Sequence, residues 1–564
     1  MNNAVILCEA ISNGCYYAKE IRKHGLVPII VNPAIAVSSD YAALRVEGKK
    51  NTDPYEPLYL NDAESPEEVL EQVADYNILA VVAGSELGVP FADQLAAAFG
   101  LPGNNPLSSN ARRDKNAMQA ALANAGLRHI RGRAVQDIDA ALAFARELDR
   151  WPLVVKPLAS AATQGVHICQ DQEALCRCME SLFQENTLFG SPNTSLLVQE
   201  YIEGREYVVN SVSRQGVHRL TDFWVYNKLR MGDAGNAYDN MRLFTRLEPG
   251  HRRIIQYACQ VLTALDFSFG PSHMEIMVDA EGPVLIEVGA RPMGGHFSEE
   301  ILRECLGHYL VDHALTSYLD PAAFEQLLHS PYRPAKHLMI KLLIAPHEMV
   351  VNSVPALPLL HKLTSVRALM MDASLLQSRI PMTVDMLSSP GSLLLCHEDE
   401  HKLLEDYQLI RRIEANFFGM LLEERPFVPE FNREWSSLAL ERLTMHQNRI
   451  ERPTALIIDD GAEAPASAHT ILPLSRAGEI QPPVDIIVHC GNRVMDFAAY
   501  FTFLEGLVEK LTPGNCLVVT PWGMQGLEYG EAGFEILCQL FGLRLELPHP
   551  AFPELLIARK EVAQ

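Results

Sequence analysis

Short apolar runs alternate with amphipathic stretches along the first hundred residues of the chain. Apolar runs at 5–7 and 27–31 flank a stretch at 16–24 whose apolar residues recur at helical spacing. A further apolar run at 79–83 precedes a helical pattern at 89–99. Strands that alternate with helices in this way are typical of an α/β domain built on a parallel sheet.

Between residues 274 and 288 the pattern changes to two short, mostly apolar runs that each contain one glutamate. Two strands, 274–278 and 284–288, are predicted to form a β-hairpin around the turn-forming stretch 279–283. If the five loop residues close the hairpin symmetrically, Glu275 falls opposite Glu287. The residues predicted to face the core are Met274, Ile276, Val284, Ile286 and Val288.

Two carboxylates in cross-strand positions have Cβ atoms roughly 5 Å apart and repel one another. We therefore expect a positive charge between Glu275 and Glu287. A hard divalent cation, Mg²⁺ or alternatively Mn²⁺, suits two carboxylates combined with phosphate oxygens and waters. The alternative is a solvated hairpin whose acids only face water.

Residues suited to substrate contact lie near this hairpin and near the first domain's strands. Arg291 follows Glu287 by four residues, and Gly294 and Gly295 would let backbone approach a ligand closely. A fixed cation beside a carboxylate pair points to an anionic substrate. Glu86 follows the apolar run at 79–83, where open sheets bind ligands, and is a candidate to hold a substrate ammonium or an ordinary acid at a helix start.

Two lysines stand in positions that favour phosphate binding. Lys115 begins an Ala-rich helical pattern, and Lys156 follows three apolar residues of a predicted strand. A buried ammonium needs a partner, and a phosphate would be one. The small, polar segment 159–165 could close its backbone N–H groups over phosphates, although it is not a Walker loop and could be an ordinary hairpin loop.

Composition restricts the class of protein. The 564 residues, 48% hydrophobic, allow three or four domains. A net charge of -23 without a Lys/Arg block argues against nucleic-acid binding. The 11 cysteines form no CxxC unit, and no basic leader or apolar run of about 18 residues is present, so we expect a cytoplasmic protein with free thiols and no membrane contact.

The order of these motifs resembles the ATP-grasp superfamily over about residues 1–425. The resemblance is carried by a lysine at a helix start, "VVKP", a small flexible loop, "VQEYIEGREY", and two hairpin acids ending in "EVGARP". "EYVVNSVSRQGVHRLTDFWVYNK" and "PSHMEIM" are most similar to the carboxylate–amine ligases that join amino acids into dipeptides, the L-amino acid ligase group.

The resemblance implies roles for many residues. Lys115 and Lys156 would hold ATP phosphates, backbone at Glu200–Ile202 would meet adenine, Glu206 would meet the ribose, Glu275 and Glu287 would bind Mg²⁺, and Arg291 would steady phosphate and the acyl group. The implied ATP-binding set is Lys115, Lys156, Ser160, Gln164, Gly165, Glu200, Tyr201, Ile202 and Glu206. The candidate substrate contacts are Glu86, Lys228, His273, Gly294 and Gly295. Many relatives carry Asn where this chain has Gly289, which puts a second metal site in doubt.

The predicted fold class is α/β: an ATP-grasp fold with a Rossmann-like N-terminal domain and an extra C-terminal α/β domain resembling half a methyltransferase. The expected divisions are 1–105, 106–330, 331–425, a linker at 426–452, and a non-catalytic appendage at 453–564 for docking or dimerisation. The expected activity is ATP-dependent amide formation from amino acids. A bicarbonate-activating carboxylase and an ATP-binding regulator that has lost its catalytic activity are the alternatives.

Overall fold

The computed structural model describes residues 1–421 except 36, 159–164, 186–191, 231–235, 296, 346, 351–359, 361, 372–374, 376–377 and 387, and beyond them 455–459, 470–472, 484–490, 505–509, 511–519, 539, 541–546 and 556–560. It comprises two compact units. The first contains residues 1–342 and 384–389, and the second contains 343–383 and 390–564. No helix among the described residues is both long enough and apolar enough to cross a membrane.

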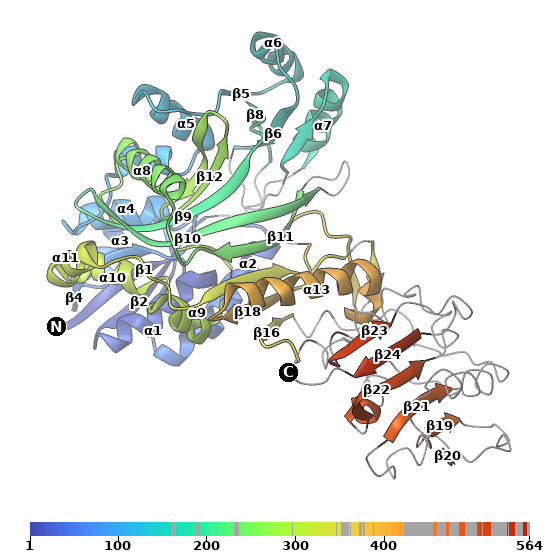
Figure 1. Cartoon of the computed structure of the whole chain (residues 1–564). Helices are drawn as coiled ribbons and strands as arrows, with labels where there is room; N and C mark the ends of the chain where they lie inside the picture. The colour runs from blue at the N-terminus through green and yellow to red at the C-terminus, as the bar shows by residue number, and fades with distance from the viewer. Residues whose placement is uncertain are drawn as a thin grey trace. The chain divides into compact units, whose positions relative to one another are not determined.

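The first unit begins with a parallel sheet (Figure 1) of order β3-β2-β1-β4. Residues 4–8 of β1 are all fully buried although successive side chains point to opposite faces, so helices cover both faces of this sheet. The predicted α/β domain is therefore present. Its elements are β1 (Asn2–Cys8), α1 (Tyr16–Lys23), β2 (Val27–Pro33), α2 (Ser39–Thr52), β3 (Leu58–Ala63), α3 (Pro66–Gln72), β4 (Tyr76–Ala83) and α4 (Val89–Ala98).

The loops after β1 and β4 cross in direct backbone contact. A Cβ on Gly14, in the short 3-10 helix η1 (Ser12–Cys15), would lie 2.1 Å from the carbonyl oxygen of Gly84. Ser12 itself adopts a positive φ of 56°. Only glycine at these crossing points allows the two loops to meet at the carboxyl end of the sheet.

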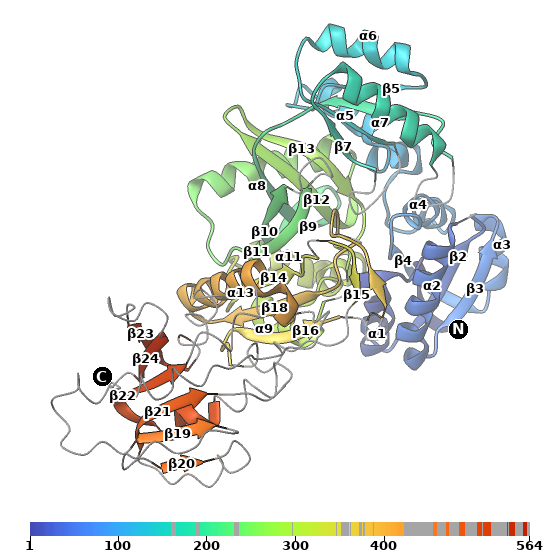
Figure 2. The same cartoon turned by 90° about the vertical axis from the view of Figure 1, so that its right-hand side faces the viewer.

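A small antiparallel sheet of order β5-β8-β6-β7 follows (Figure 2). Helices α6 (Ile138–Leu148) and α7 (Gln172–Gln184) pack against it and form its own apolar core. The preceding helix α5 (Lys115–Asn124) begins where predicted, because the Asp114 carboxylate accepts a hydrogen bond of 2.7 Å from the Ala117 N–H. The strands are β5 (Gly132–Val135), β6 (Leu153–Pro157), β7 (His167–Cys169) and β8 (Leu196–Glu200).

A larger antiparallel sheet carries the order β13-β12-β9-β10-β11-β14 in this unit. Its strands are β9 (Arg205–Arg214), β10 (Val217–Arg230), β11 (Asn236–Leu243), β12 (Phe269–Asp279), β13 (Gly282–Gly289) and β14 (His337–Leu342). The remaining helices of the unit are α8 (Pro249–Ala264), α9 (Glu299–Leu306), α10 (Asp312–Leu319) and α11 (Pro321–His329).

The predicted hairpin is β12–β13, and Glu275 does pair with Glu287. The predicted route to that register was wrong, because Asp279 pairs with Gly282 across a two-residue turn and Val278 faces Pro283. A bulge beyond Glu275 restores the register by placing an extra residue in β13. The bulge also turns Leu285 into the core in place of the predicted Ile286, which is only half-buried.

The second unit contains the antiparallel pairs β16 (Val366–Met370) with β18 (Ser392–His397) and β15 (Met349–Val350) with β17 (Arg379–Ile380), and the helix α13 (Glu400–Leu421). A further sheet has the order β20-β19-β21-β22-β24-β23. Strands β19–β22 are parallel and β24 is antiparallel between β22 and β23, an α/β arrangement in line with the predicted appendage. The predicted linker, 426–452, lies outside the described residues. The strands are β19 (Ala455–Asp459), β20 (Thr470–Leu472), β21 (Val484–Cys490), β22 (Leu511–Val519), β23 (Leu543–Glu546) and β24 (Leu556–Lys560).

Candidate functional site

The two hairpin carboxylates lie in opposite electrostatic environments. Burial, together with the nearby carboxylates of Glu287 and Glu206, raises the pKa of Glu275 to about 8. Burial also disfavours the charged form of Glu287, but the ammonium groups of Lys115 and Lys156 lower the pKa of Glu287 to about 2. The pair therefore consists of one carboxylate held ionised and one that readily takes a proton.

Lys115 supplies the positive charge next to Glu287. Its Nζ lies 2.9 Å from Glu287 Oε2, and its side chain is 9% exposed. Burial acts to lower the pKa of Lys115, but Glu287 raises it overall. The start of α5 thus holds an ammonium directly on the hairpin.

Lys156 is the most unusual cation of the site. It lies in β6, is 5% exposed, and has no hydrogen-bond or ion-pair partner among the described residues. Burial, reinforced by the charge of Lys115, lowers the pKa of Lys156 to about 8. A buried ammonium without a partner is costly, so this position favours an anionic ligand.

Glu206 and Lys228 form a buried ion pair on the neighbouring strands β9 and β10. Lys228 Nζ lies 2.7 Å from Glu206 Oε2 and 4.3 Å from the ring centre of Tyr238. The other carboxylate oxygen, Glu206 Oε1, is buried and has no hydrogen-bond partner among the residues that the structure describes. That oxygen can accept a hydrogen bond from a hydroxyl group of a ligand. Lys228, which was predicted only as a substrate contact, forms its ion pair with Glu206.

Arg291 lies against Glu86, which the sequence placed more than 200 residues away. Arg291 Nε is 3.4 Å from Glu86 Oε2, and Arg113 Nε is 3.8 Å from Glu86 Oε1. A Cβ added to Gly289 would lie 2.9 Å from Glu86 Oε2 and 3.3 Å from Arg291 Cζ. The missing side chain at position 289 is thus what leaves room for this ion pair.

His273 is held by a buried hydrogen-bond chain behind the hairpin. Its Nδ1–H donates to Asn210 Oδ1 at 2.7 Å, and Asn210 Nδ2 donates in turn to Asp222. Burial and the charge of Arg291 lower the pKa of His273 to about 3, so the ring is neutral. Its unprotonated Nε2 lies 3.9 Å from Glu275 Oε1.

The predicted adenine segment lies at the end of β8. The Glu200 side chain is occupied by structural contacts, because it accepts a 2.8 Å hydrogen bond from the Arg131 N–H and another of 2.8 Å from Arg150. Tyr201 and Ile202 are half-buried beyond the strand. Their backbone remains the part of this segment able to meet a ligand.

Two members of the predicted phosphate loop, Ser160 and Gln164, lie outside the described residues. Gly165 is described, with a φ of +69° and Pro157 Cδ 3.0 Å from the position of an added Cβ. Gln199, one residue before Glu200, was not predicted, but its Nε2 is buried and has no hydrogen-bond partner among the described residues. Nothing in the alternation of β8 distinguishes this amide from a structural one.

The Gly294–Gly295 loop is held by residues that the sequence did not single out. Asn13 Nδ2 donates to the carbonyls of Met293 (2.8 Å) and Gly294 (3.2 Å), and Ser12 Oγ donates to the carbonyl of Gly295 (2.6 Å). A small polar Ser-Asn-Gly sequence directly after the first predicted strand was the signal that could have found them.

The described site combines an acidic pair with several cations, a set suited to a polyanion and a metal. Within the part of the chain that the structure describes, no three His, Cys, Asp or Glu side chains gather as metal ligands. The protein's donors are therefore two facing carboxylates. This set fits Mg²⁺, which usually takes one or two carboxylates and completes its octahedron with phosphate oxygens and waters.

Comparisons with known proteins agree with this chemistry. A family model described as an ATP-grasp domain matches residues 149–300. Dapdiamide A synthase of Enterobacter agglomerans is 32% identical over 371 residues, which are 64% of this chain and 84% of that protein. Alanine–anticapsin ligase of Bacillus subtilis is 27% identical over 199 residues, which are 31% of this chain and 41% of that protein.

Solved structures share the fold at low sequence identity. The L-amino acid ligase from Bacillus licheniformis aligns with a TM-score of 0.55 and 18% identity, over 73% of this chain and 97% of that one. Carboxyaminoimidazole ribonucleotide synthase from Aspergillus clavatus, solved with ATP, aligns with a TM-score of 0.53 and 12% identity, over 73% and 99%. The similarity to dapdiamide A synthase, in identity and in coverage, is high enough to show the family and not only the fold. This chain therefore belongs to the ATP-grasp carboxylate–amine ligases, which use ATP to form C–N bonds and release ADP.

Proposed function

We propose that this enzyme joins two amino acids into a dipeptide through an acylphosphate. A carboxylate oxygen of the first amino acid forms a bond to the γ-phosphorus of ATP, and the bond from that phosphorus to the bridging oxygen breaks to release ADP. The amine nitrogen of the second amino acid then bonds to the acyl carbon, loses a proton to solvent, and displaces phosphate. The observation that carries this proposal is the buried ammonium of Lys156, which has no partner among the described residues and lies near the Glu275–Glu287 pair.

Lys156 and Lys115 are positioned to neutralise phosphate oxygens as negative charge builds up between the reactants. Glu206 Oε1, buried without a partner, is suited to accept a ribose hydroxyl. Glu275 and Glu287 would hold Mg²⁺, which when bound supplies charge neutralisation to the phosphates. The positive charge of the bound ion would keep both acids ionised, against the burial and the carboxylate repulsion that raise the pKa of Glu275.

On the substrate side, Arg291 would steady the transferred phosphoryl and acyl oxygens. Its contact with Glu86 leaves that acid without a free charge for a substrate ammonium, so we assign Glu86 to Arg291 rather than to the amine. His273, neutral and fixed in one tautomer by Asn210, lies beside Glu275 as a polar wall of the acyl site. The small segment 159–165 would exclude water, which would otherwise hydrolyse the acylphosphate.

The test is a matrix of paired amino acids incubated with ATP and Mg²⁺. We expect ADP and phosphate to appear in equal amounts only when both a carboxylate and an amine substrate are present, with a dipeptide detected by mass. Release of AMP and pyrophosphate would contradict the acylphosphate route. Turnover that depends on bicarbonate alone would contradict the dipeptide product.

A further inference from the structure

The loop that follows the hairpin is fastened to the N-terminal domain by its carbonyl groups. Asn13, 1% exposed, donates from Nδ2 to the carbonyls of Met293 and Gly294, and Ser12 donates to the carbonyl of Gly295. Three consecutive carbonyls are thus held by one short helix that lies about 280 residues earlier in the sequence. A loop that needed only to connect β13 to α9 would not require this arrangement.

The orientation of the Asn13 amide is fixed on both sides. Its NH₂ group must face the two carbonyls. The reverse orientation would place the acceptor Oδ1 against the carbonyl oxygens of Met293 and Gly294, with no donor between the three oxygens. Its Oδ1 accepts a hydrogen bond of 2.9 Å from the Tyr309 hydroxyl. Every polar atom of this buried side chain therefore has a partner.

Peptide geometry then sets the direction of two N–H groups. In a planar trans peptide the N–H points opposite to the C=O of the preceding residue. Because the carbonyls of Met293 and Gly294 converge on Asn13, the N–H groups of Gly294 and Gly295 both point away from it. Neither N–H has a hydrogen-bond partner within the described part of the chain.

Open space lies next to Gly294. A Cβ added there would meet no atom of the described residues within 4 Å, whereas one added to Gly295 would lie 3.0 Å from Phe297 Cζ; both glycines are only half-buried. Gly295 has a φ of +96°, a conformation that other residues rarely adopt. Successive N–H groups that point the same way form a typical anion-binding arrangement.

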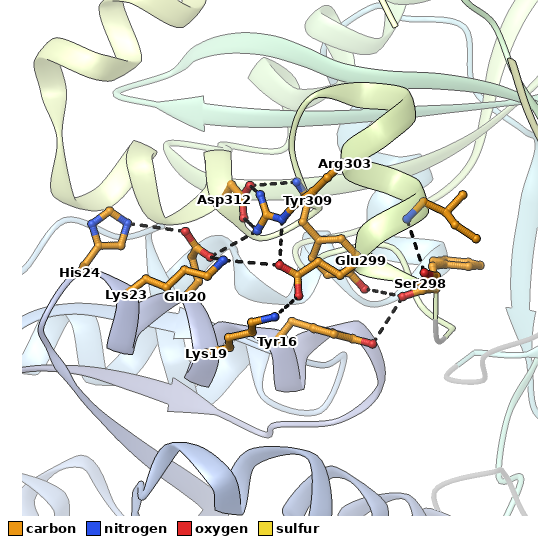
Figure 3. A network of polar contacts seen from close by, with 12 residues as sticks. Tyr16, Lys19, Glu20, Lys23, His24, Ser298, Glu299, Arg303, Tyr309 and Asp312 are labelled. Carbon is orange, nitrogen blue, oxygen red and sulfur yellow. Dashed lines mark hydrogen bonds and ion pairs between the residues drawn. The ribbon is translucent and has the colours of Figure 1, made fainter. Parts of the chain in front are cut away.

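Helix α1, which directly follows the short helix η1 that carries Asn13, is anchored to the segment beyond the loop (Figure 3). Lys19 on α1 contacts Glu299 on α9 at 2.5 Å, and Arg303 Nε contacts the same carboxylate at 2.8 Å. The hydroxyl of Tyr16 donates to the carbonyl of Phe297 at 3.4 Å. These contacts fix α1 to the chain just beyond the loop, as accurate positioning of a binding group requires.

We propose that Asn13 is a positioning residue that aligns the Gly294 and Gly295 N–H groups as a donor pair for an anionic oxygen of the substrate. This inference rests on the proposed function. The anionic oxygen has two sources in that reaction: the free carboxylate of the amine substrate, or the oxyanion that develops on the acyl carbon during amide formation. Arg291, four residues before Gly295, provides a cation on the same loop.

Asn13→Asp tests the alignment, because it keeps the shape of the side chain and removes both donors. Asn77→Asp is the matched control: Asn77 is an exposed asparagine of the same domain whose amide donates to Asn3 at 2.8 Å. We expect hydrogen–deuterium exchange of a peptide spanning 289–295 to rise in Asn13→Asp and to be unchanged in Asn77→Asp. Unchanged exchange in Asn13→Asp would overturn the positioning role.

The kinetic arm uses the amino acid pair found by the substrate matrix. We expect Asn13→Asp to lower kcat/KM by about 10- to 100-fold, in the range for loss of one oriented donor, while the affinity for a non-hydrolysable ATP analogue stays within about twofold. A rise in KM for the amine substrate identifies its carboxylate as the ligand, and a fall in kcat identifies the oxyanion. Faster hydrogen–deuterium exchange in Asn13→Asp, combined with wild-type kcat and KM, would overturn the proposal.

Two further variants apply if Asn13→Asp does not fold. Tyr309→Phe removes only the hydroxyl that orients Asn13, and a smaller effect in the same direction is expected. Gly294→Ala places a methyl group in the open space beside the donors, so it should lower turnover without lowering the melting temperature. A wild-type enzyme that turns over no amino acid pair would remove the proposed function, whereas the exchange experiment would still report whether Asn13 fixes the loop.

Discussion

A side chain at position 289 would begin only 2.9 Å from Oε2 of Glu86, so the absence of a Cβ on Gly289 is what lets Glu86 lie against Arg291. The resemblance to the ATP-grasp superfamily implies an Asn side-chain amide at this place in many members. In this chain the Glu86 carboxylate, from the N-terminal domain, lies next to the position that a side chain on residue 289 would occupy. The departure from the family pattern is therefore accompanied by a compensating contact, which argues against simple decay of the site.

Gly289→Ala should keep the fold and displace the Glu86 carboxylate from Arg291. The colliding atom is the end of a flexible side chain, so melting temperature should change little. We expect kcat/KM to fall about tenfold, the equivalent of about 1.4 kcal/mol. Glu86→Gln should have a similar effect, and the double variant should be no worse than either single one. Additive losses in that cycle would show that the two residues act separately.

Lys156→Met should stabilise the protein without nucleotide and weaken nucleotide binding. It removes a buried ammonium that has no partner among the described residues, which should raise the free energy of unfolding by about 1–3 kcal/mol. Calorimetric titration with a non-hydrolysable ATP analogue should show at least about tenfold weaker binding. Lys115→Met is the contrasting variant, because loss of its 2.9 Å contact with Glu287 should destabilise the protein. Equal affinity for the analogue in wild type and Lys156→Met would contradict a phosphate role.

Glu287→Gln and Glu275→Gln should differ in stability although both lose activity. Glu287 is the partner of Lys115, so Glu287→Gln leaves a buried ammonium unpaired and should cost about 1–3 kcal/mol of unfolding free energy. Relief of the cross-strand repulsion between the two carboxylates would by itself give a slight gain in stability, a fraction of about 1 kcal/mol, so the contact with Lys115 reverses the sign. Within the described part of the chain, Glu275 has only His273, at 3.9 Å, as a basic neighbour within ion-pair distance, so Glu275→Gln should be nearly neutral in its effect on stability. Both should lower turnover by at least about 100-fold at saturating Mg²⁺, and an unchanged rate in either would remove that residue from the metal site.

The stability of the protein should fall below neutral pH because of His308 and His313, whose rings lie 4.1 Å apart. Burial lowers the pKa of His308 to about 4 and that of His313 to about 3. The unfolded chain, with histidine pKa values of about 6.5, binds protons first as the pH falls. Stability is therefore full above about pH 6.5 and is lost progressively towards pH 3–4.

Urea denaturation should show a loss of about 4 kcal/mol between pH 7.5 and pH 5 from this pair, about 2 kcal/mol from each histidine. The variant His308→Gln/His313→Asn should have a shallower dependence on pH over that interval. An identical slope in the variant and the wild type would assign the acid sensitivity to other groups.

The sequence predicted local features well where a single strand or helix determines them. Lys115 starts a helix because Asp114 caps it, and Glu275 faces Glu287 because side chains alternate along a hairpin. The predicted turn was three residues too long. Glu275 still pairs with Glu287 only because a bulge in β13 offsets that difference. The alternation of side chains along a strand does not predict a bulge. For this reason Ile286 was wrongly predicted to face the core.

Partnerships between distant segments could not be predicted. The pairing of Lys228 with Glu206, and that of Arg291 with Glu86, depends on strand order and domain packing rather than on any spacing in the chain. The same holds for Asn13, which looks like an ordinary loop residue until the loop 280 residues later is placed against it. Each of these residues acts through a contact that only the assembled fold creates.

Strand β13 is the outermost strand of its sheet, a place where unpaired backbone groups can recruit foreign strands and start aggregation. At the bulge this risk is removed by side chains: the N–H of Leu285 donates to the Tyr257 hydroxyl at 3.0 Å, and the carbonyl of Leu285 accepts from Gln119 Nε2 at 2.9 Å. Pro283, which has no N–H to offer, blocks the same border nearer the turn. The bulge that sets the register of the two carboxylates therefore also protects the edge of the sheet. Replacing it with a regular strand would leave an unpaired, aggregation-prone edge beside Glu275 and Glu287.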